Sequence, residues 1–77
     1  MKAEELKLLT KGDIVTVRCR SGFMEGQRVR AEFVGYKKVS YADKKMYHFK
    51  NIDYGSPGSI FTETKEHILT DVYQKYD

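Results

Sequence analysis

Residues 13–20 read DIVTVRCR and residues 27–34 read QRVRAEFV, and these two stretches decide the fold. In both, apolar and polar side chains alternate, which is the pattern of a strand with one buried face. Glycines bound the segment between them, so the two strands are predicted to pair as a long antiparallel hairpin. The buried face would then carry Val15, Val17, Val29, Ala31 and Phe33, and the solvent face would carry Arg18, Arg20, Arg28 and Arg30.

The rest of the chain predicts further short elements. Residues 2–9 favour a short helix that must dock on the core, because an isolated helix of this length is unstable in water. Gly35, inside the second strand, indicates a bulge or bend. Further strands are predicted at 46–52 and 59–62. Residues 64–76 fit either a helix or a tight turn at 65–67 with a strand at 68–73, and the need to cover open sheet edges favours the second.

The length of 77 residues predicts one small domain spanning 1–77. The single cysteine, Cys19, excludes a disulfide framework and a thiolate zinc site, and its position predicts a small buried hydrophobe. No apolar run approaches the roughly 20 residues that span a bilayer, and residues 1–10 are too acidic for a signal peptide. We therefore expect no membrane association and a cytoplasmic location.

Charge is distributed unevenly along the chain. Residues 11–50 contain ten lysines and arginines against four acids, a net charge of +6, whereas residues 51–77 carry a net charge of −3. A basic middle segment is typical of a partner that carries phosphates.

Four features of the chain form a recognisable set: Gly12-Asp13 before the first strand, Val-x-Val at Val15 and Val17, the strand from Val29 to Tyr36, and the closing segment Phe61, His67-Ile68-Leu69 and Val72. Together they resemble the small SH3-like barrels, a group that includes the Sm-like RNA-binding proteins. The resemblance implies a mainly β fold, a five-stranded SH3-like barrel at 11–77 after a short N-terminal helix at 1–10. It transfers no RNA-binding residues, because the Asp-x-x-x-Asn motif of the Sm-like proteins is absent.

The sequence offers little for catalysis, and we predict that the protein is not an enzyme. His48 and His67 lie on different segments without partners at metal-ligand spacing, although Glu63, Glu66 or Asp71 could pair with His67. Residues 54–58 lack the lysine and following helix of a phosphate-binding loop. No metal or other cofactor is expected.

The leading functional hypothesis is a non-enzymatic module that binds RNA or single-stranded DNA. Arginine and lysine side chains would contact phosphates, and tyrosine rings would stack on unpaired bases. The predicted site residues are Arg18, Arg20, Arg28, Arg30, Tyr36, Lys37, Lys38, Tyr41, Lys44 and Lys45. The alternative for the same residues is an ordinary solvated face, partly neutralised by Glu32.

Two other hypotheses remain open at this point. The chain could be a small accessory protein, of the kind that phages and mobile elements encode, which binds or inhibits a protein partner or associates with itself. Its contacts would be Phe23 and Met24, unless these fold back over the core, together with Tyr73 and Tyr76 in the acidic tail. An oligomer could also enclose a small anionic ligand, such as a nucleotide, between basic faces.

Overall fold

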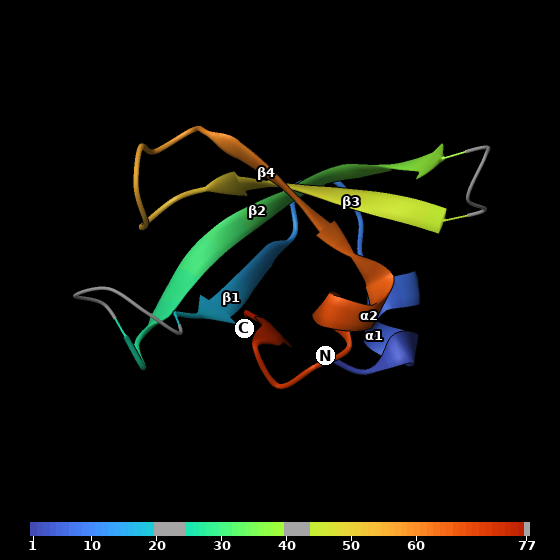
Figure 1. Ribbon diagram of the computed structural model, residues 1–77, viewed down its shortest axis with the longest axis horizontal. Helices are drawn as coiled ribbons and strands as arrows, with labels where there is room; N and C mark the ends of the chain where they lie inside the picture. Colours follow the sequence, from blue (N-terminus) through green and yellow to red (C-terminus); the bar gives the residue numbers. More distant parts are fainter. Residues whose placement is uncertain (20–24, 40–43, 77) are drawn as a thin grey trace.

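A computed structural model describes residues 1–19, 25–39 and 44–76 of the chain. These residues form a mainly β fold of two short helices and five strands (Figure 1). In chain order the elements are α1 (Ala3–Lys7), β1 (Ile14–Arg18), β2 (Arg28–Val39), β3 (Lys44–Asn51), β4 (Ile60–Thr64), α2 (Lys65–Ile68) and β5 (Tyr73–Lys75).

All five strands belong to one antiparallel sheet in the order β4-β3-β2-β1-β5. The sheet is strongly twisted but not closed, because β4 and β5 form its two edges and do not pair with each other (Figure 1). The amino terminus lies against the start of β5, where the amino nitrogen of Met1 donates hydrogen bonds to the carbonyls of Thr70 and Tyr73 at 2.8 and 2.7 Å.

The predicted hairpin between the first two strands is confirmed. Val17 pairs with Val29 and Arg18 with Arg28, so the two apolar faces and the two basic faces coincide. Val15, Val29, Ala31 and Phe33 are buried, and Val17 packs against them.

The core lies on the inner face of the sheet and is closed by the two helices. Phe49 is central, because its ring lies 5.5 Å from Phe33, 5.6 Å from Phe61 and 5.6 Å from Tyr73. Leu6 of α1 and Ile68 of α2 complete the cluster. The two short helices are therefore ordered by docking on the sheet, as expected of helices of this length.

Two expectations about the chain need correction. The one-turn helix before the last strand is present, with Thr64 capping it by accepting from the His67 amide at 3.3 Å, but the strand begins at Tyr73 rather than at residue 68. Ile68 ends α2 with its side chain fully buried, so it cannot also begin a strand. Cys19, expected to be buried, is a partly exposed free thiol.

Candidate functional site

The arginines of β1 and β2 lie together on the outer face of the sheet. Arg18 lies directly opposite Arg28 in the register, and Arg30 lies two residues further along β2. Their placement side by side agrees with the sequence-based prediction, whereas Arg20 and Tyr41 lie outside the described residues.

Arg18 and Arg28 form a cross-strand pair of like charge. Such pairs destabilise a sheet, and no carboxylate of the described residues forms an ion pair with either one. In addition, the Arg28 Nη1 atom is buried and has no hydrogen-bond partner within the described part of the chain. Buried donors are nearly always paired, so Arg28 keeps one unsatisfied donor, but an atom with almost no exposed surface cannot itself reach a ligand. What suits this position to an anion is the unneutralised positive charge of the cross-strand pair.

Arg30 differs from its neighbours because Asp53 neutralises it. Its Nε and Nη2 atoms donate to Asp53 at 2.8 and 2.9 Å, and its amide donates to the same carboxylate at 3.0 Å. Hydrogen bonds from the Arg30 side chain and backbone lower the pKa of Asp53 to about 2, and Asp53 raises the pKa of Arg30. Nothing in the local sequence indicates this pair, since 23 residues separate its members.

A bulge at Gly35 divides the remaining predicted residues between the two faces of the sheet. The register shifts between Phe33 and Gly35, after which Tyr36 pairs with Tyr47 and Lys37 with Met46. Tyr36 therefore joins the inner face, with its ring 5.9 Å from that of Tyr47, and Lys37 joins the outer face. Tyr36 consequently lies on the opposite side of the sheet from the arginines.

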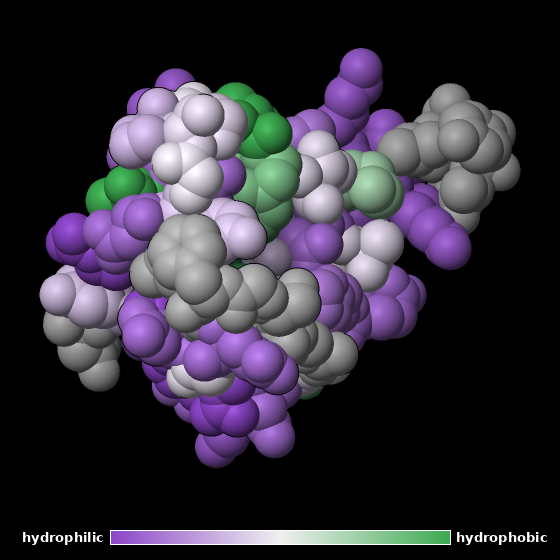
Figure 2. Space-filling model, turned by 60° about the vertical axis from the view of Figure 1, so that its left-hand side comes forward, coloured by the Kyte–Doolittle hydropathy of each residue, from purple (hydrophilic) through white to green (hydrophobic). Residues whose placement is uncertain are grey.

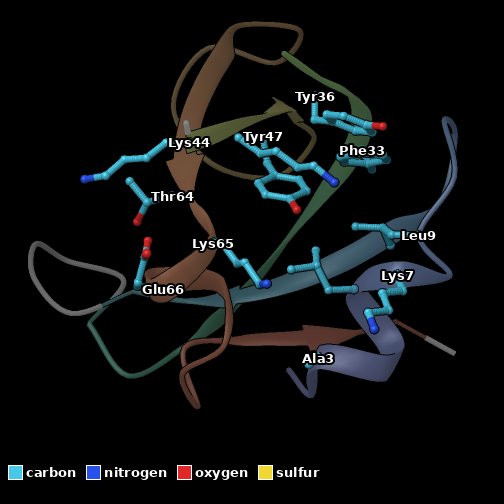
Figure 3. Close-up of a pocket in the computed structure, with 12 residues that line it drawn as sticks. Ala3, Lys7, Leu9, Phe33, Tyr36, Lys44, Tyr47, Thr64, Lys65 and Glu66 are labelled. Carbon is cyan, nitrogen blue, oxygen red and sulfur yellow. The ribbon is translucent and has the colours of Figure 1, made fainter. Parts of the chain in front are cut away.

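A pocket opens on the inner face where β2 and β3 meet the two helices (Figure 3). We call it the lysine–aromatic pocket, and its volume is about 390 Å³. It is lined by Ala3, Leu6, Lys7, Leu9, Phe33, Tyr36, Lys44, Lys45, Tyr47, Thr64, Lys65 and Glu66. Tyr36, Lys44 and Lys45 were predicted from the sequence as site residues, whereas Lys7 and Lys65, which lie on helices far from them in sequence, were not.

The lysine–aromatic pocket combines positive charge with aromatic surface. The Lys45 Nζ atom lies 4.8 Å from the centre of the Tyr36 ring, which is a cation–π contact. Burial raises the pKa of Tyr47, so this phenol stays protonated at neutral pH. Lys44 lines the pocket with its stem, but its amino group points away from it (Figure 3). Lys38 lies across from Lys45 in the register, at the same end of the hairpin.

The four residues proposed for protein binding differ in whether the structure describes them and in how exposed they are. Tyr73 is only 2% exposed and belongs to the core, so as a surface contact it is wrong, whereas Tyr76 is 47% exposed. Phe23 and Met24 lie outside the described residues. Of this set, Tyr76 alone is described and accessible.

At α2, the Glu63 carboxylate lies against the His67 Nδ1 atom, and the His67 ring lies edge-on to Tyr73 at 5.6 Å. Burial raises the pKa of Tyr73 well above its usual range, and the hydrogen bond and charge of Glu63 raise it further. Glu63, His67 and Tyr73 thus connect the end of β4 with α2 and β5. No group of three or more His, Cys, Asp or Glu side chains in the described residues could hold a metal ion.

Apolar surface is limited on the face drawn in Figure 2. Hydrophilic residues cover most of it, and hydrophobic residues show only in small areas. A second hollow, of about 330 Å³, is more apolar and is lined by Val17, Cys19, Val29, Ala31, Asn51, Tyr54 and Phe61. No helix in the described ranges is long and apolar enough to cross a membrane.

Comparisons with protein-family models, with curated proteins and with solved structures give no match for this chain.

Proposed function

We propose that the protein is a non-enzymatic module that binds RNA or single-stranded DNA, with the outer face of the sheet contacting the phosphates. The observation that carries this proposal is the Arg18–Arg28 pair. Arg18 and Arg28 lie directly opposite each other in the register, and neither forms an ion pair with an acid of the described residues. A phosphate supplies both the opposite charge and the acceptor atoms, and the planar fork of arginine fits it bidentately.

Further basic side chains extend this surface along the sheet. The register assigns Lys37 and Lys50 to the same outer face as the arginines, because their strand neighbours Tyr36 and Phe49 occupy the inner face. Glu32 pairs with Lys50 and offsets one of these charges. A backbone that follows the face would therefore meet Arg18 and Arg28 at one end and Lys37 at the other.

We also propose that the protein belongs to the SH3-like barrels. An N-terminal helix, five antiparallel strands in the order β4-β3-β2-β1-β5, a bulged β2 and one helical turn before β5 support an SH3-like barrel that is open between β4 and β5. We assign the protein to this group as a proposal, with the Sm-like proteins as the subgroup that its element order resembles.

The salt dependence of binding to a single-stranded oligonucleotide tests the function. For single strands, log K falls by about 0.7 per phosphate contact for each unit of log salt. The variant Arg18→Ala/Arg28→Ala should therefore bind more weakly and lose roughly 1.4 from the magnitude of the slope. A matched control, Lys11→Ala/Lys75→Ala, removes the same charge from two exposed positions outside the proposed face.

Wild-type binding that does not change between low and moderate salt would refute the proposal. Equal losses in the arginine variant and the lysine control would also refute it, because they would show that net charge alone determines binding. Arg18→Lys/Arg28→Lys adds a further check. It keeps the charge, and it should recover only part of the affinity because lysine cannot contact phosphate bidentately.

A further inference from the structure

We propose that the lysine–aromatic pocket binds a nucleoside monophosphate unit, with the base against Tyr36 and Tyr47 and the phosphate held by Lys45 and Lys65. This goes beyond the function proposed for the outer face, because the pocket lies on the inner side of the sheet and uses other residues. The unit could be a free nucleotide or one unpaired nucleotide of a bound strand.

The pocket has the size of a small-ligand site. Its volume of about 390 Å³ lies within the range of about 300–1,000 Å³ that such sites occupy. Its walls come from separate parts of the chain, namely α1, the paired ends of β2 and β3, and the start of α2. A ligand in it would be enclosed by residues that the folded sheet and two docked helices hold in place.

The aromatic wall suits a planar base. Tyr36 is 57% exposed and lines the pocket, with the Lys45 Nζ atom 4.8 Å from the centre of its ring and the Tyr47 ring 5.9 Å away. An exposed aromatic ring of this kind offers a surface on which a base can stack. Tyr47 is 7% exposed, and Figure 3 shows its hydroxyl pointing into the pocket. This hydroxyl makes no hydrogen bond within the described residues and stays protonated, so it can donate to an acceptor on the base.

The positive charges suit a phosphate that is attached to that base. Lys45 lies over the Tyr36 ring at 4.8 Å, so an ammonium group is beside the stacking surface. Lys65 extends toward the pocket from α2 (Figure 3), and Lys7 lines it from α1 with its amino group directed away from Tyr36 and Tyr47. Glu66 also lines the pocket and carries a negative charge. No described carboxylate, however, forms an ion pair with Lys7, Lys45 or Lys65. The pocket is therefore basic as well as aromatic, which favours a ligand that has both a ring and a negative charge.

Isothermal titration with AMP, adenosine and inorganic phosphate tests the combination. We expect AMP to bind with one site per chain and at least about tenfold more tightly than adenosine or phosphate, because each of these lacks one half of the contacts. Failure of AMP to saturate, or phosphate binding as tightly as AMP, would overturn the proposal.

Substitutions locate the site. Lys45→Ala/Lys65→Ala should weaken AMP binding by about tenfold or more, and Tyr36→Ala should weaken AMP and adenosine alike. Lys11→Ala/Lys75→Ala removes the same charge elsewhere and should leave AMP affinity within about twofold. Amide spectra of each variant report whether it is folded. Equal AMP affinity in a folded pocket variant and in the lysine control would overturn the proposal.

Competition identifies the source of the nucleotide unit. If a single-stranded oligonucleotide perturbs the amide signals of the pocket residues and AMP reverses this perturbation, the natural ligand is an unpaired nucleotide of a strand. If the oligonucleotide binds without affecting those signals, the ligand is a free nucleotide. Arg18→Ala/Arg28→Ala should leave AMP binding intact. The proposal for the outer face and the proposal for the pocket can therefore be refuted independently of each other.

Discussion

The two faces of β2 carry the same sign of charge in different settings. On the outer face, Arg18 and Arg28 lie opposite each other on neighbouring strands, and within the described register neither is paired with an aromatic residue. On the inner face, Lys45 lies over the Tyr36 ring, and both residues line the lysine–aromatic pocket. Under the two proposals made above, the positive charge of both faces favours an anionic partner, and the surroundings of each charge distinguish a face that would contact phosphate alone from one that would contact a phosphate together with a base.

The largest expected effect comes from a change that disrupts both faces together. Phe49 is fully buried and contacts three other aromatic rings. Phe49→Ala should lower the free energy of unfolding by about 3–5 kcal/mol, measured by urea denaturation. Because a domain of this size has a total stability of only about 4–11 kcal/mol, AMP and oligonucleotide binding should both fall.

Tyr54→Ala provides the comparison, since Tyr54 is an aromatic residue that is 41% exposed. It should change the free energy of unfolding by less than about 1 kcal/mol. A cost for Phe49→Ala as small as this would contradict the role of Phe49 as the centre of a shared core.

A smaller effect is expected from Gly35→Ala, which should change ligand binding on the inner face of the sheet more than on the outer face. Gly35 has a φ of +149°, and an added Cβ would meet no atom within 4 Å, so Gly35→Ala introduces backbone strain rather than a clash. We expect a loss of about 1–3 kcal/mol in the free energy of unfolding. Because the bulge directs Tyr36 to the inner face, AMP binding should weaken more than binding to the outer face.

Gly55→Ala is the matched control, because Gly55 has a φ of +65° in a turn remote from the pocket lining. It should cost similar stability and leave AMP affinity unchanged. Equal effects of the two substitutions on AMP binding would show that the bulge does not shape the pocket.

The smallest effect concerns the ion pair between Arg30 and Asp53. Asp53 has a pKa of about 2 in the folded protein against an ordinary value of 3.8. Because the folded pKa is the lower one, the pair stabilises the protein above pH 3.8, and this contribution is lost as the pH falls through about 2. The difference in thermal midpoint between wild type and Asp53→Asn should therefore be constant near neutral pH and disappear at about pH 2.

The same substitution frees the Arg30 guanidinium group for phosphate. The slope of log K against log salt should steepen by about 0.7 for a single-stranded oligonucleotide. A stability difference that persists at pH 2, together with an unchanged slope, would show that the pair does not restrain Arg30.

Local pattern predicted much of the sheet. Alternation in residues 13–20 and 27–34 gave the hairpin and the faces of its arginines, and Gly35 marked the bulge. The consequence of the bulge for Tyr36 was not predictable, because one unpaired residue reverses the face of every residue after it. β5 was placed too early, since Ile68 fits an alternating strand as well as the helical turn that buries it.

The site was less predictable than the sheet, and the reason is distance along the chain. Lys7 and Lys65 meet at one pocket only because α1 and α2 dock near the same end of the sheet. Asp53 neutralises Arg30 only because the turn after β3 reaches β2. Such contacts depend on tertiary packing, and no short-range pattern carries them.

Chemical-shift mapping with two ligands tests the central claim most directly. An abasic oligodeoxynucleotide presents phosphates without bases, and AMP presents a base with a phosphate. We expect two separate sets of perturbed amide signals, around Arg18 and Arg28 for the abasic strand and around Tyr36, Lys45 and Tyr47 for AMP. Perturbation of one common set by both ligands, or of neither set, would contradict it.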